Sequence, residues 1–247
     1  MRARSVRSRR LARTAAWFLF GAVAWPAPRH EAVAQTRRPV VHVFLPLDAT
    51  SSVVGKMLRD QLPALDVTVF GRFRDFEDAL AKHPDAVVAI TPVLDYQREK
   101  VTLQGQRGGK SMEAYVLASV GQPLDGSLSG KTIGVVDLMG REGTQMLLAG
   151  LVKVNDIKMK RVAKVEDLLP LLEFATADGV VLSSASLPRL SERTRLGVRT
   201  RELAGAMVGL PAIAVLNPAT RDVVVSSFEK LDLATKRLLG IDGWRVQ

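Results

Sequence analysis

Hydroxyl-bearing residues and glycines recur at the points where apolar runs of this chain end and helical patterns begin. The positions with this character are Thr50, Ser51 and Ser52 after the run 40–47, Thr91 after 86–90, Gly143 and Thr144 after 132–136, and Ser183 and Ser184 after 179–182. Hydroxyl groups and the free backbone N–H groups of a helix N-terminus are suited to binding an oxyanion. Each residue alone also fits an ordinary helix cap. Their recurrence at several strand ends predicts a small-anion site.

The loop at 140–144, Gly-Arg-Glu-Gly-Thr, places two opposite charges at one expected helix N-terminus. Glu142 in this place would repel an anion. Arg141 could offset that repulsion and pair with an anionic ligand, or it could pair with Glu142 or face solvent. We include Arg141 among the candidate ligand-binding residues.

The sequence offers little support for catalysis or for a cofactor. It contains no cysteine and three histidines, His30, His42 and His83, so neither a thiolate metal site nor a catalytic histidine pair is expected. The strand-end carboxylates Asp48, Asp95 and Asp137 have no spacing that would pair them, and no nucleophile motif is present. We therefore expect a binding protein that uses no cofactor and no metal.

The first 34 residues have the pattern of a cleavable signal peptide. Six arginines within residues 1–13 precede an apolar run at 14–25, and the small-residue site Ala32-Val33-Ala34 follows. The run is short for spanning a bilayer, which argues against an uncleaved anchor. We expect cleavage after Ala34 and a periplasmic location.

Removal of this segment changes what the net charge means. The whole chain carries +10, but residues 1–34 hold seven arginines and one glutamate, or +6, which leaves 28 basic and 24 acidic residues, or +4. The later sequence also has few aromatic residues that could stack on bases. A nucleic-acid partner is therefore not expected.

The elements that must position these residues form two successive α/β series. The first runs from strand 40–47 through helices near 53–62 and 73–81 to strand 86–90, and the second from strand 131–137 through helices 143–154 and 165–174 to strand 179–182. Strands 114–120 and 198–202 and closing helices at 219–231 and 235–239 complete the pattern, with Trp244 in the helical tail. This alternation predicts an α/β fold with mostly parallel sheets flanked by helices.

Four segments resemble periplasmic solute-binding proteins of the type 2 fold, especially the phosphate/phosphite/phosphonate-binding branch. They are Leu-Ser-Gly-Lys-Thr-Ile-Gly-Val-Val-Asp at 128–137, Pro-Asp-Ala-Val-Val-Ala-Ile-Thr-Pro at 84–92, Ala-Asp-Gly-Val-Val at 177–181, and Leu-Leu-Gly-Ile-Asp-Gly-Trp at 238–244. Their order and spacing cover nearly all of the chain after the signal. The loop at 140–144 departs from the Ser/Thr-rich loop of the phosphonate branch.

The resemblance implies two lobes with a ligand cleft between them. Lobe 1 would comprise 35–112 and 207–247, and lobe 2 would comprise 113–206. The expected function is capture of a small anionic solute of the phosphate/phosphonate class by a monomer that delivers it to an ABC permease in the inner membrane. The alternative is a periplasmic adaptor or sensor of the same fold, with a changed ligand or none, that contacts another envelope protein.

Overall fold

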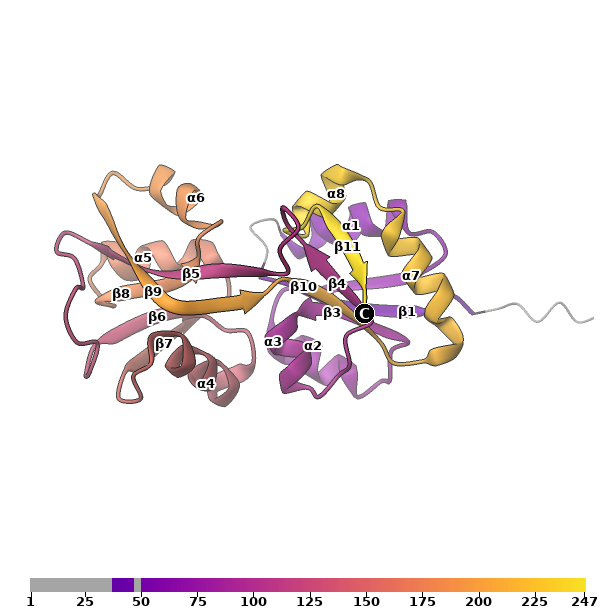
Figure 1. The fold of residues 1–247 in the computed structure, drawn as a ribbon, viewed down its shortest axis with the longest axis horizontal. Helices are drawn as coiled ribbons and strands as arrows, with labels where there is room; N and C mark the ends of the chain where they lie inside the picture. Colours follow the sequence, from indigo (N-terminus) through magenta and orange to yellow (C-terminus); the bar gives the residue numbers. More distant parts are fainter. Residues whose placement is uncertain (1–36, 47–49) are drawn as a thin grey trace, which may run out of the picture. The chain divides into compact units, whose positions relative to one another are not determined.

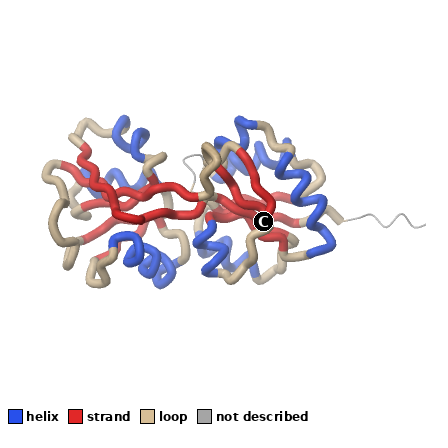
Figure 2. The backbone as a smooth tube through the Cα atoms, viewed as in Figure 1, coloured by secondary structure: helices blue, strands red, loops and turns tan. Residues whose placement is uncertain are grey.

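The computed structural model of the protein describes residues 37–46 and 50–247. The expected signal peptide and its cleavage site lie outside these residues. Two β-sheets organise the described chain, each with helices packed on it (Figures 1 and 2). The prediction of a two-lobed α/β fold is thereby confirmed.

The first sheet has six strands, arranged in the order β11-β4-β10-β3-β1-β2. The strands are β1 (Val40–Phe44), β2 (Asp66–Phe70), β3 (Ala86–Ile90), β4 (Leu103–Gln106), β10 (Pro211–Val215) and β11 (Gly243–Val246). Strand β1 pairs in parallel with β2 and β3, whereas β10 runs antiparallel to both β3 and β4. All five residues of β3 are buried, as expected for a strand covered on both faces.

The second sheet has five strands in the order β7-β6-β8-β5-β9. They are β5 (Met112–Val120), β6 (Thr132–Val136), β7 (Lys158–Val162), β8 (Gly179–Ser183) and β9 (Val198–Gly209). Strand β6 is parallel to β7 and β8, and β5 is antiparallel to β8 and β9. The parallel strands bring the ends of β6 and β8 to one edge, where loops lead into helices.

Helices cover both faces of each sheet. They are α1 (Ser51–Gln61), α2 (Phe73–Leu80), α3 (Thr91–Tyr96), α4 (Gly140–Val152), α5 (Leu168–Glu173), α6 (Leu187–Glu192), α7 (Arg221–Glu229) and α8 (Leu233–Leu238), with short 3₁₀ turns η1 (Val165–Asp167) and η2 (Pro218–Thr220). On the second sheet, α4 lies on one face and α5 on the other (Figure 1). On the first sheet, α2 and α3 share one face and α1, α7 and α8 lie on the other (Figure 1).

The chain passes between the two sheets at two neighbouring places. The first passage is the segment from Arg107 to Ser111, which joins β4 to β5 and contains Gly108 and Gly109 with φ of 56° and 75°. The second passage is Leu210, between β9 and β10, whose N–H donates to the Ser111 carbonyl at 2.9 Å. The two passages are therefore hydrogen-bonded to one another.

Four local features differ from the sequence-based expectation. Two short helices, α3 and α6, stand where only strand ends and loops were expected, and both have a proline at a first-turn position. Strand β9 extends to Gly209 instead of ending at 202, because it pairs with β5 along nearly its whole length. Trp244 lies in β11, opposite Gly105 of β4, and not in a helical tail. That pairing involves residues about 140 positions apart, so no local pattern reveals it.

Candidate functional site

A cavity of about 500 Å³ is lined by residues from both lobes. Its walls are formed by Leu45, Pro46, Ile90, Arg107, Pro211, Ala234, Arg237, Leu238, Leu239 and Gly240 from the first lobe and its passages, and by Glu113, Tyr115, Val135, Val136, Leu138, Val165, Val181, Leu182, Ser183, Ala185, Ser186 and Arg189 from the second. Most of these side chains are apolar, and a few polar groups stand among them. This composition is typical of small-molecule sites.

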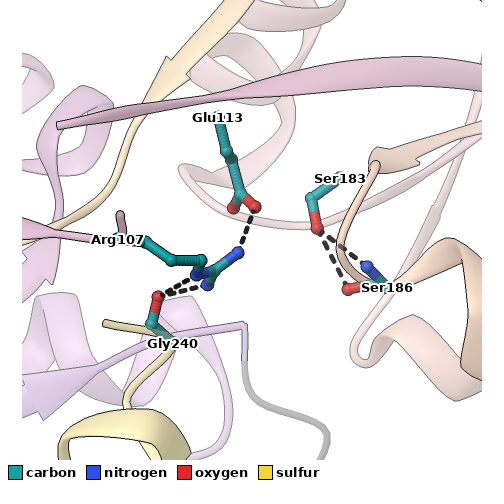
Figure 3. A network of polar contacts seen from close by, with 5 residues as sticks. All are labelled: Arg107, Glu113, Ser183, Ser186 and Gly240. Carbon is teal, nitrogen blue, oxygen red and sulfur yellow. Dashed lines mark hydrogen bonds and ion pairs between the residues drawn. The ribbon is translucent and has the colours of Figure 1, made fainter. Parts of the chain in front are cut away.

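Arg107, in the first passage, connects the two lobes through hydrogen bonds (Figure 3). Its Nη1 lies 3.0 Å from Oε2 of Glu113 at the start of β5, and its Nε donates to the Gly240 carbonyl at 2.8 Å, with Nη2 also donating to that carbonyl. Gly240 has φ of 82°, which only glycine adopts without strain, and this conformation ends the α8 segment at the point where Arg107 binds it. The guanidinium thus holds both the C-terminal end of lobe 1 and the first strand of lobe 2.

Among the residues that the structure describes, Glu113 is the sole acidic residue lining the cavity, and its side chain is 20% exposed. Burial raises the pKa of its carboxyl, while the charge and hydrogen bond of Arg107 and a hydrogen bond from Ser183 act in the opposite direction. Ser183 also lies 3.1 Å from the Ser186 hydroxyl and accepts from the Ser186 N–H at 3.2 Å (Figure 3). The carboxylate is therefore already engaged by Arg107.

Arg237 supplies the positive charge that is left for a ligand in the described part of the lining. Among the described residues, Arg107 and Glu113 both line the cavity and pair with each other at 3.0 Å. Arg237 stands in the last turn of α8, is exposed, and makes no ion pair with any residue in the described part of the chain. An anionic group entering the cavity would meet this guanidinium group, which is a strong donor to carboxylates.

Tyr115 contributes a buried phenol to the cavity wall. It lies in β5 opposite Ser183, and burial, together with the charge of Glu113, raises the pKa of its hydroxyl well above the ordinary value. The phenol is therefore neutral throughout the physiological range and can serve as a hydrogen-bond donor.

Among the hydroxyl residues singled out from the sequence, the lining includes Ser183 but not the others. Thr144 is fully buried, and its Oγ1 accepts from the N–H groups of Leu138 and Met139 at 3.2 and 3.1 Å and donates to Oδ1 of Asp137 at 3.1 Å. These contacts are all within the loop between β6 and α4. Oδ2 of Asp137 in turn accepts a hydrogen bond from Nη1 of Arg161 at 2.5 Å.

The residues around α1 and α3 occupy other places. Thr50 and Ser51 line a separate small cavity of about 40 Å³, and the Thr50 and Ser52 hydroxyls lie 3.2 Å apart on an exposed surface. The Thr91 hydroxyl donates to the Leu210 carbonyl at 3.0 Å and to Oε1 of Gln104 at 3.2 Å. Thr91 therefore braces the second passage between the lobes.

The remaining sequence candidates surround the start of α4 and the end of β8. Arg141 is exposed, and Gly143 is buried against Tyr96 and Met139. Ser184 is exposed, while its N–H donates to the Ala114 carbonyl at 2.9 Å. The structure thus does not bring the candidate hydroxyls together around one cavity.

Sequence reasoning did not single out the charged residues that the structure does bring together. Arg107 and Glu113 flank a glycine turn between two strands, and Arg237 lies near the end of a short helix. One sequence feature could have indicated them: opposite charges lie on either side of Gly108-Gly109, at the connection between the two α/β series. Arg189 had no such signal, because α6 itself was not expected.

Within the described residues, no helix combines the length and the apolar character needed to cross a bilayer. The same residues include no group of three or more histidine, cysteine or carboxylate side chains placed to bind a metal ion.

Comparisons with solved structures identify the fold. The substrate-binding protein of an amino acid ABC transporter matches 81% of this chain over 97% of its own length, at 17% identity and a TM-score of 0.56. The GluR0 ligand-binding core from Nostoc punctiforme, in complex with L-glutamate, matches 81% of this chain over 96% of its own, at 14% identity and a TM-score of 0.57. The match to the periplasmic VFT2 domain of BvgS from Bordetella pertussis covers 82% of this chain and 93% of that domain, at 15% identity and a TM-score of 0.52.

No protein-family model and no curated protein sequence matches this chain. The likeness to solved structures shows that the chain has the two-lobed fold of type 2 periplasmic solute-binding proteins. The comparisons do not single out the phosphate/phosphonate branch within that fold.

Proposed function

We propose that this protein is an exported solute-binding protein that captures a small solute with an acidic group between its two lobes. The observation that carries the proposal is the cavity of about 500 Å³, in which both lobes supply apolar walls and Arg237 supplies a guanidinium group without an ion pair among the described residues. A solute that contacts both walls binds the closed arrangement better than the open one. Closure would then remove water from Arg237 and strengthen its attraction for the acid.

The proposal replaces a hydroxyl-based site with an arginine-based one. In the oxyanion site expected from the sequence, the hydroxyls of Thr50, Thr144 and Ser183 would converge on one ligand. The Thr144 hydroxyl is instead committed to its own loop, and Thr50 lines another cavity. Phosphate and phosphonate therefore enter the binding screen as competitors of organic acids and amino acids.

The fate of the captured solute is the second part of the proposal. A substrate-binding protein of an amino acid ABC transporter shares the fold over nearly its whole length, which supports delivery to a permease. The periplasmic VFT2 domain of BvgS shares the fold as well, so the fold alone does not separate delivery to a permease from the adaptor or sensor role. Uptake of the identified solute by cells with and without this protein separates the two roles, because an adaptor leaves uptake unchanged.

A thermal-shift screen tests capture itself. The protein would be expressed from its complete sequence, purified from the periplasmic fraction, and heated with amino acids, monocarboxylates, phosphate and phosphonates. A ligand that binds only the folded state raises the melting temperature in proportion to the logarithm of its concentration above Kd. At least one acidic solute is expected to raise it in this way. No shift across all these classes would contradict the proposal and favour an adaptor without a ligand.

Export is tested on the same preparation. Sequencing of the N-terminus is expected to start at Gln35, because Ala32-Val33-Ala34 follows the apolar run. A chain that starts at Met1 or stays in the cytoplasm would contradict the export proposal and leave the binding screen unaffected.

A further inference from the structure

A second cavity, of about 300 Å³, adjoins the cleft within lobe 2. It lies between η1 and α5 on one side and α6 on the other, and its apolar walls are Val165, Leu169 and Leu190. Val165, Ser186 and Arg189 line both this cavity and the cleft cavity, so the two spaces share a wall. We call the second space the side cavity. Its apolar walls suit a hydrocarbon group.

The charges around the two cavities favour an anion over a zwitterion. Glu113, an acidic residue of the cleft lining, is bound by Arg107 at 3.0 Å. In the side cavity, Glu166 pairs with Arg193 at 3.1 Å, and Glu192 is exposed to solvent. An ammonium group in the cleft would have to displace Arg107 from its carboxylate, whereas a carboxylate needs no such exchange.

The apolar walls also set a requirement on the rest of the ligand. Leu45, Ile90, Val135, Leu138 and Leu239 belong to the cleft lining. A small inorganic oxyanion would leave these side chains without contacts and would lose its own hydration beside them. A ligand with a hydrocarbon body instead gains free energy from each apolar group that it buries.

We propose, building on the solute-binding function above, that the ligand is a monocarboxylate with an apolar body. Its carboxylate binds Arg237 in the cleft, and its hydrocarbon chain lies along the apolar walls and extends toward the side cavity. Arg237 selects the acid group, and the position of Val165 and Ser186 between the two cavities sets the path of the chain.

Two ligand comparisons on the wild-type protein, measured by calorimetry, test this proposal. In the series acetate, butyrate and hexanoate, affinity is expected to rise by about fourfold for each added methylene group. In the pair 4-methylpentanoate and L-leucine, which share a carbon skeleton, the acid without an ammonium group is expected to bind at least tenfold more tightly. Inorganic phosphate is expected to bind more weakly than hexanoate.

Two variants locate the carboxylate and the chain. Arg237→Gln is expected to weaken hexanoate binding by about tenfold or more, because a hydrogen bond to a charged group is lost. Arg221→Gln, which removes the same charge from an exposed position at the start of α7, serves as the matched control. Ser186→Leu places a larger side chain between the two cavities and leaves less room for the hydrocarbon chain to reach the side cavity. The ratio of hexanoate to butyrate affinity is therefore expected to fall. Melting temperatures verify that each variant is folded.

Tighter binding of L-leucine than of 4-methylpentanoate would overturn this proposal and leave the solute-binding function standing. Binding of phosphate with no response to the carboxylate series would do the same. Equal affinities of acetate and hexanoate would overturn the role of the apolar walls. Absence of binding by every acid, amino acid and phosphate compound would contradict the solute-binding function itself.

Discussion

The hydroxyl of Thr144 stabilises the loop that leads into α4. It is enclosed by the protein, accepts two backbone N–H groups and donates to Asp137. Thr144→Ala would leave two buried N–H donors without that acceptor, which costs about 1–3 kcal/mol of unfolding free energy. Thr144→Ser retains the hydroxyl and should recover most of the loss. Urea denaturation of the three proteins measures the differences.

Calorimetry with the solute found in the screen completes this test. Because the hydroxyl faces its own loop, the affinity of Thr144→Ala is expected to stay within twofold of wild type at a temperature where the variant is folded. A tenfold loss of affinity with unchanged stability would instead restore Thr144 as a ligand-binding residue.

His42 in β1 gives the stability a dependence on pH. Burial lowers the pKa of its imidazole, the charge of Lys82 lowers it further, and Asp66 partly opposes both. The unfolded chain therefore takes up this proton at a higher pH, near 6.5, than the folded chain does. The stability contributed by neutral His42 is fully present above that pH and is lost as the pH falls toward the folded pKa.

His42→Phe removes this titration. The free energy of unfolding of the variant, measured by urea denaturation between pH 7.5 and 5.5, is expected to fall less steeply with decreasing pH than that of wild type. His83→Asn is the matched control, because His83 is exposed and its φ of 51° suits asparagine. Equal slopes for wild type and His42→Phe would refute this account of His42.

At the scale of the element, helix α4 contains three glycines, of which Gly143 and Gly150 have opposite surroundings. A Cβ on Gly150 would meet nothing within 4 Å, so Gly150→Ala should stabilise the protein by about 0.5–1 kcal/mol through helix propensity. A Cβ on Gly143 would lie 2.5 Å from the Met139 Cβ and 2.9 Å from Tyr96. Gly143→Ala should therefore destabilise it by about 1–3 kcal/mol, the usual cost of overpacking.

Melting temperatures of the two alanine variants check both signs. Stabilisation by Gly143→Ala would show that the contacts with Met139 and Tyr96 are looser than the structure has them. Destabilisation by Gly150→Ala would contradict the exposed setting of that position.

The long elements could be predicted from sequence because their patterns are local. Strands such as β3 are continuous apolar runs bounded by Pro84 and Pro92, and α2 has the apolar spacing of an amphipathic helix. The short helices α3 and α6 have six residues each, too few for a periodic signal, and the proline in each resembles a loop marker. Strand β11 exists because β4 is beside it, which no local pattern reveals.

The candidate site was harder to predict for the same reason. Strand ends were used to find it, and Ser183 at the end of β8 does line the cleft cavity. The charged groups, however, come from a passage between sheets, from the start of β5 and from two short helices. Arg107 and Gly240 are 133 positions apart, and their contact exists only once the C-terminal segment has packed against β4 of the first sheet.

At the scale of the whole molecule, the two passages between the sheets are the segments that would bend if the lobes close on a solute. They are hydrogen-bonded to each other through Leu210 and Ser111, and Thr91 braces Leu210 from the end of β3. Short paired connections of this kind allow two lobes to rotate while each stays intact. The Arg107–Glu113 contact lies beside this pivot, so it can persist in both arrangements.

Small-angle X-ray scattering of the periplasmic protein, with and without a saturating solute whose binding calorimetry has established, tests capture between the lobes most directly. We predict that the radius of gyration falls when the solute is added, and that Arg237→Gln requires a higher solute concentration for the same change. An unchanged scattering curve at full occupancy would contradict the account, since a solute that leaves the lobes apart is not held between them.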